Sequence, residues 1–123
     1  MRDNIERTIL ASMLEGSFYG ADERIINFEL DEKLFKNKIH KFIVRAIKRL
    51  HEQDKPIDSN VLYYELQKAY KKTKYIIVPP KIEQTILEIM ATNAFTTYSA
   101  FVRYYKILEE EQEEELKKHI ARI

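Results

Sequence analysis

The sequence predicts an all-α protein, and two observations support that prediction. Only two glycines and three prolines occur in 123 residues, too few for the many tight turns of an all-β fold. In addition, apolar side chains recur at intervals of three and four residues, which is the spacing of one helix face. The length suits one domain, so we expect a single unit of packed helices.

The first helix is expected over residues 4–14. Its apolar positions share one face: Ile5, Ile9, Leu10, Met13 and Leu14. Asp3 and Glu6 have the spacing of a capping box, and Gly16 suits the left-handed stop at a helix end. A short helix is expected within residues 21–28, and Asp31 begins the next segment.

The clearest signal is a pair of helices joined by a hard corner. The first helix of the pair has a buried stripe at Ile39, Ile43, Ala46, Ile47 and Leu50. Pro56 cannot donate an amide and disfavours helical backbone at Lys55, so this helix must end before it. Asp58 or Ser59 then caps a helix that continues through Leu66. Ile57 is expected to fill the gap between the two helix ends.

The rest of the chain gives weaker signals. An extended piece is expected over residues 75–78, followed by a helix with Pro80 in its first turn. After a break at 91–97, a last helix is expected over residues 97–121. Its first half carries Tyr98, Phe101, Tyr105 and Leu108 on one side, and its second half is strongly acidic.

The sequence predicts no catalytic, metal-binding or cofactor-binding residue. It has no glycine-rich phosphate loop and no cysteine. His40, His51 and His119 are far apart and have no acidic partner at ligand spacing in a site-like setting. The absence of cysteine, of a membrane-length apolar run and of a signal segment favours the cytoplasm and no membrane contact. The net charge of +1 argues neither for nor against nucleic acid.

Two surfaces are candidate binding sites. The first is a possible nucleic-acid or partner patch, because aromatic rings interleaved with cations can stack bases and hold phosphates. The patch comprises Lys68, Tyr70, Lys71, Lys72 and Lys74. The alternative is that the tyrosines form an amphipathic rim and the lysines a solvated helix end near the C-terminal dipole.

The second candidate is a self-association interface on the last helix. Its aromatic side is larger than packing in so small a domain requires, and Tyr and Phe supply contact area at low entropy cost. The interface comprises Tyr98, Phe101, Tyr104, Tyr105 and Leu108. The glutamates at 109–115 form either a solvated face or a docking surface for a basic partner.

Several segments together resemble the N-terminal domain of the bacterial replicative DNA helicase, the DnaB family. The opening Asn4-Ile5-Glu6 matches the first helix of that domain. A longer block then matches without a gap at Phe35, His40, Ile43, Ala46, Ile47, Leu50, Pro56, Ile57 and Asp58. Leu62 and Leu66 follow, and Tyr104, Leu108 and Glu110 match the last helix. Leu34 stands where the family usually has Asp, which marks a divergent member.

The resemblance implies a small orthogonal helical bundle, at about 1–92, followed by a helical-hairpin element with an interface helix at about 97–121. It implies a non-catalytic collar that assembles as a dimer or a trimer of dimers within a hexamer. Primase, and in some cases the helicase loader, would dock on this collar during DNA replication. ATP, magnesium and the DNA contact would belong to other parts of the parent helicase. The chain would be either a piece of such a helicase or a free-standing relative.

Two other readings remain open from the sequence. The first is the C-terminal helicase-binding domain of primase, which has a similar bundle and hairpin. The second is a stand-alone single-strand nucleic-acid-binding module that uses the Tyr/Lys patch. This module would bind with an affinity that falls steeply as salt rises.

Overall fold

The computed structural model describes residues 2–16, 22–72, 78–92 and 97–121. Every regular element within these ranges is helical, so the predicted all-α fold is confirmed. The elements are α1 (Arg2–Gly16), α2 (Glu23–Ile26), the 3₁₀ turn η1 (Glu32–Leu34), α3 (Lys38–Glu52), α4 (Ser59–Lys72), α5 (Pro80–Met90) and α6 (Tyr98–Ala121). Among the described residues, no helix is both long enough and apolar enough to span a bilayer.

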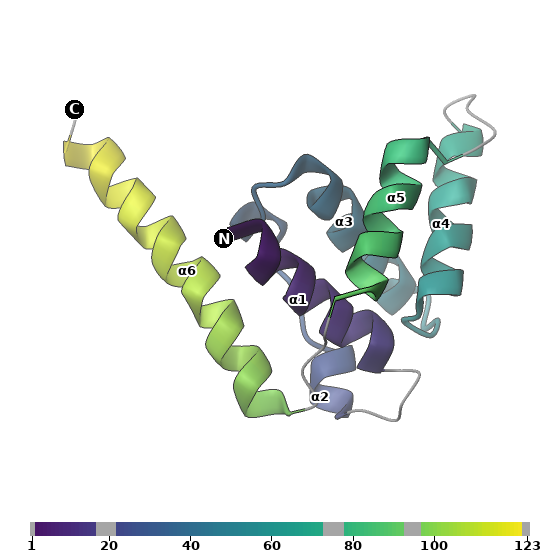
Figure 1. Cartoon of the computed structure of the whole chain (residues 1–123), viewed down its shortest axis with the longest axis horizontal. Coiled ribbons are helices and arrows are strands. Elements are labelled where there is room, and N and C mark those ends of the chain that lie inside the picture. Colours follow the sequence, from purple (N-terminus) through teal and green to yellow (C-terminus); the bar gives the residue numbers. More distant parts are fainter. Residues whose placement is uncertain (1, 17–21, 73–77, 93–96, 122–123) are drawn as a thin grey trace.

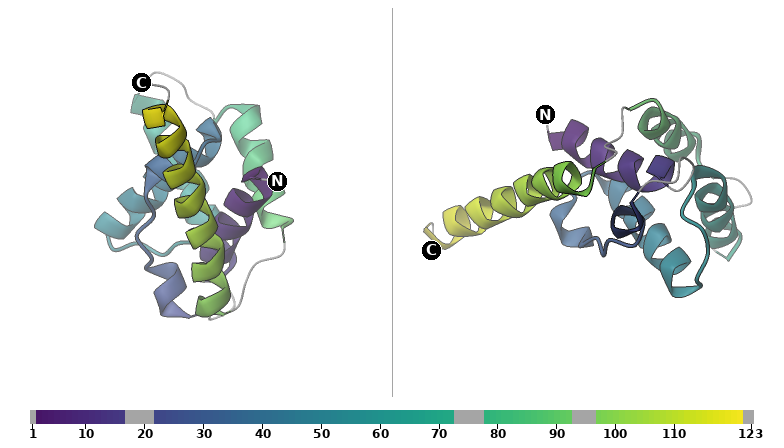
Figure 2. Two further views of the ribbon diagram at one scale, coloured as in Figure 1. Left: turned by 90° about the vertical axis from the view of Figure 1, so that its left-hand side faces the viewer. Right: turned by 90° about the horizontal axis from the view of Figure 1, so that it is seen from below.

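Helix α1 is the centre of the fold. It contacts α2, α3, α5 and α6, and α4 completes the body by packing against α3 and α5 (Figure 1). Five apolar side chains of α1 are therefore almost fully buried: Ile9, Leu10, Ala11, Met13 and Leu14. Helix α6 begins against this body, and its C-terminal end projects beyond it (Figure 2).

The corner between α3 and α4 has the predicted form. The N–H of Lys55 donates to the carbonyl of Leu50 at 2.9 Å, which closes α3 with a Schellman-type turn. Asp54 occupies the left-handed position of this turn, with φ at 54°. Ile57 is only 1% exposed, and the side chain of Asp58 accepts the N–H of Val61 at 2.8 Å. The structure thus confirms that Ile57 fills the gap between the two helix ends and that Asp58 caps α4.

The structure does not confirm two of the local predictions from the sequence. The capping box is wrong, because α1 already begins at Arg2 and therefore contains Asp3 in its first turn. The Glu6 carboxylate instead accepts the backbone N–H groups of Lys36 and Asn37, just before α3. Of the expected extended piece, residues 75–77 lie outside the described residues. Val78 is buried, and its N–H donates to the side chain of Gln67.

Candidate functional site

The aromatic half of α6 forms part of the chain's own core. Phe101, Tyr105 and Leu108 are buried against α1, α2 and η1. The ring of Phe28 meets those of Phe101 and Tyr105 edge-on, at centroid distances of 5.0 and 4.7 Å. The Tyr105 hydroxyl accepts the N–H of Asp31 at 2.8 Å. These contacts fix the direction in which α6 leaves the body.

The sequence predicts a self-association interface at residues 98–108 on the ground that the helix has more aromatic surface than packing within the domain requires. The observed packing contradicts that reasoning. Phe101, Tyr105 and Leu108 are at most 7% exposed, so a second copy of the chain cannot reach them. Tyr98 and Tyr104 are half-buried, and the Arg24 guanidinium lies 4.4 Å from the centre of the Tyr98 ring. The apparent excess of aromatic surface is therefore used within the chain.

The C-terminal half of α6 is held by charged side chains. Arg2 pairs with Glu111 at 2.7 Å, and Lys36 pairs with Glu115. Beyond these contacts, Leu116 is 53% exposed and Ile120 is 68% exposed. Both continue the four-residue spacing of the buried side of α6, which ends at Leu108. That spacing is a sequence signal that could have identified this exposed apolar strip.

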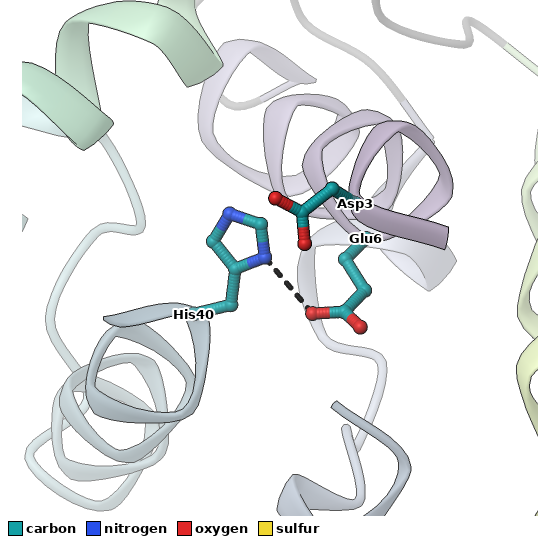
Figure 3. A group of neighbouring side chains, drawn as sticks. All are labelled: Asp3, Glu6 and His40. Carbon is teal, nitrogen blue, oxygen red and sulfur yellow. Dashed lines mark hydrogen bonds and ion pairs between the residues drawn. The ribbon is translucent and has the colours of Figure 1, made fainter. Parts of the chain in front are cut away.

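A second group of side chains joins α1 to the start of α3. Asp3, Glu6 and His40 each offer one possible metal-ligand atom, and these atoms lie within 4.8 Å of one another (Figure 3). His40 Nδ1 and Glu6 Oε1 are 2.9 Å apart and nearly inaccessible to solvent. A cation would have to break this bond and compete with the two backbone amides on Glu6. The existing bonds favour a structural role for the group.

The charge on Glu6 is stabilised by these contacts. Burial opposes the charge and by itself raises the pKa of Glu6. The hydrogen bond from His40 and those from the backbone of Lys36 and Asn37 outweigh burial, so the pKa is lower than usual. Spacing rules could not find this pair, because its members lie 34 residues apart in the sequence.

The predicted Tyr/Lys patch lies mostly on the C-terminal half of α4. Lys71 and Lys72 are exposed, Lys68 and Tyr70 are half-buried, and Lys74 lies outside the described residues. A groove of about 410 Å³ runs between α3 and α4 beside this patch. Its walls include Arg49, Gln53, Lys68 and Lys72. The structure thus places two of the predicted lysines at a concave surface.

The family described as "DnaB-like helicase N terminal domain" matches residues 2–110 of the chain. This match covers most of its length. The chain belongs to the DnaB-like helicase N-terminal domain family. No curated protein and no solved structure shows a significant match.

The match to this DnaB-like domain spans α1 to α5 and the first half of α6. Leu116 and Ile120 lie beyond residue 110, so the exposed strip on α6 follows the matched region. Within the match, a groove of about 260 Å³ with both polar and apolar walls lies between α4 and α5. Leu87 and Met90 line it and are 63% and 43% exposed. The domain therefore carries accessible apolar side chains on α5 as well as α6.

Proposed function

We propose that this domain is a non-catalytic N-terminal collar of a replicative DNA helicase and acts in the cytoplasm. It would join protomers of the hexameric ring, as a dimer or a trimer of dimers. It would also dock primase, and in some systems the helicase loader, during DNA replication. The observation that carries this proposal is the family match over residues 2–110. The exposed apolar side chains of α5 and α6 support a binding role.

Self-association would use the C-terminal half of α6. Leu116 and Ile120 lie one helical turn apart, as the anchors of a helix–helix contact must. The ion pairs of Arg2 with Glu111 and of Lys36 with Glu115 fix this part of α6 relative to the body. Less conformational freedom would then be lost when a second copy binds.

Sedimentation velocity over a range of protein concentrations tests this interface. The variant is Leu116→Asp combined with Ile120→Asp, which places two charges on the exposed strip. We expect it to sediment as a smaller species than the wild type. Phe42→Asp is the control, because Phe42 is 44% exposed on α3, which the proposed interface does not use, and the change should leave assembly unchanged. Assembly that survives the double change would reject α6 as the interface.

Phe101→Asp and Tyr105→Asp cannot serve in this experiment. Both side chains are buried, so a carboxylate there would disrupt the core of the monomer. A loss of assembly in these variants would report unfolding.

Primase docking is tested separately by co-sedimentation of the domain with its cognate primase. The wild-type domain is expected to sediment together with primase, and the molar ratio of the two proteins in the pellet should stay constant when their starting concentrations are changed. The proposed docking of primase is wrong if the domain and primase sediment as separate species at protein concentrations well above those at which the domain self-associates. Ring assembly by α6 would still stand on its own test.

A further inference from the structure

An edge of the molecule near the C-terminal end of α3 carries lysines without acidic partners. Lys55 follows α3, and Lys68, Lys71 and Lys72 lie on α4. None of these four forms an ion pair with any carboxylate in the described ranges. Lys36 is the only lysine of the described residues that forms an ion pair, with Glu115, so this edge is distinguished by the grouping of its four lysines. The edge therefore has positive charge available to a ligand.

Lys55 follows the C-terminal end of α3, and Lys68 on α4 lines the groove between α3 and α4. Lys68 is the largest cause of a lowered pKa at Lys55, followed by burial, while Glu65 opposes the change. Glu65 cannot act as a full counter-ion, because it is 5% exposed and binds Arg49 Nε at 3.1 Å. An anion between the two ammonium groups would relieve their repulsion.

An exposed aromatic ring lies beside the lysines. Tyr64 is 62% exposed, and Lys68 Nζ lies 5.0 Å from the centre of its ring. Because Tyr64 stays mostly exposed with Lys68 over its ring, a large part of the ring is accessible for stacking. Tyr64, Lys68 and Lys72 follow one another at intervals of four on α4, which places them in a row of about 12 Å.

We propose that this α3–α4 edge binds single-stranded nucleic acid, with Lys55 and Lys68 on a phosphate and Tyr64 stacked on a base. The open ring favours this ligand over an acidic protein segment, which would use only the lysines. Stacking on an aromatic ring together with backbone phosphate contacts is the usual basis of single-strand binding without sequence preference. The inference goes beyond the collar function, which requires no nucleic acid on this domain.

Fluorescence anisotropy with the 123-residue chain alone tests the site. The probe is a labelled oligothymidine of about 15 nucleotides, close to the upper site size of one small binding fold. Salt is varied from about 20 to about 200 mM, where contacts with three phosphates, one held by Lys55 and Lys68 and one each by Lys71 and Lys72, give a log–log slope of about −2. No binding at the lowest salt would overturn the proposal.

Two variants assign the contacts. Lys55→Gln with Lys68→Gln should weaken binding and reduce the slope by about 0.7, since the two lysines share one phosphate and each phosphate contact on a single strand contributes about 0.7. Lys33→Gln with Lys106→Gln is the matched control, because both lysines are exposed and lie elsewhere, on η1 and α6. Equal effects of the two pairs would mean that only net charge matters, which contradicts a defined site.

The aromatic contact is tested by Tyr64→Ala and Tyr64→Phe. The alanine variant should bind at least about fivefold more weakly, whereas phenylalanine should remain within about twofold of the wild type. A polyglutamate peptide serves as the competing ligand, and it should bind far more weakly than the oligonucleotide. An unchanged affinity in Tyr64→Ala, or equal affinity for polyglutamate, would replace the nucleic-acid site with a surface for acidic proteins.

Discussion

Removing the Glu6 carboxylate should destabilise the domain strongly. Glu6→Ala leaves His40 and the N–H groups of Lys36 and Asn37 without their acceptor. Each unsatisfied donor costs about 1–3 kcal/mol, and the low end applies because the two amides are only partly buried. The expected loss in free energy of unfolding is therefore about 3 kcal/mol, within the range for breaking one partner of a buried pair.

Urea titration followed by circular dichroism measures this loss, and thermal melting provides a second readout. At about 2.1 cal/mol/K per residue over 123 residues, a change of about 3 kcal/mol lowers Tm by about 12 °C. Glu114→Ala is the control, because Glu114 is exposed on α6 and should change stability by less than about 0.5 kcal/mol. A loss below about 1 kcal/mol in Glu6→Ala would refute the structural role of the pair.

The same pair predicts a pH dependence. The pKa of Glu6 in the folded state is lower than its ordinary value of 4.5. Its charge therefore stabilises the fold above the unfolded-state pKa, and this stabilisation is lost as pH falls through the lower folded-state pKa. The stability difference between the wild type and Glu6→Gln should be constant near neutral pH and shrink in acid. A difference that grows as pH falls would contradict the depressed pKa.

Three further substitutions test the core, the corner and the anchor of α6. Ile47→Ala should cost about 2–5 kcal/mol by urea titration, because Ile47 is 1% exposed in the core, and a cost below about 1 kcal/mol would deny its burial. Asp54→Gly should stabilise the domain by about 0.5–1 kcal/mol, since φ is 54° at this position, and any destabilisation would contradict the strained turn. Tyr105→Phe should cost about 1 kcal/mol by removing the acceptor of the Asp31 N–H, and the hydrogen exchange of that amide should accelerate.

The surface of the domain carries two separate candidate binding regions, and each is tested by a different experiment. The proposed assembly surface is the α6 strip, and the proposed nucleic-acid surface is the α3–α4 edge. Leu116, Ile120 and Tyr64 are exposed, and Lys55 and Lys68 are half-buried outside the core, so substitutions there should leave the core intact. Under the two proposals, we expect the α6 substitutions to change oligomer size without changing oligonucleotide affinity, and the α3–α4 substitutions to do the reverse.

The amino-acid sequence by itself determined the helices and the corner between α3 and α4. Apolar spacing is a property of a single helix, and Pro56 and Asp58 act on backbone next to them. The family could also be recognised from the sequence, because its motif runs without a gap through this corner. These features depend on residues within a few turns of one another.

Tertiary structure alone decided which side chains are available for binding. The sequence shows that α6 is aromatic, but only its contact with α1, α2 and η1 places Phe101 and Tyr105 inside the domain. Likewise, Glu6 has the local spacing of a helix cap, yet it bonds to His40 from 34 residues away. Local spacing specifies where a helix runs and which side is apolar. What that side packs against depends on how distant helices fill a common core.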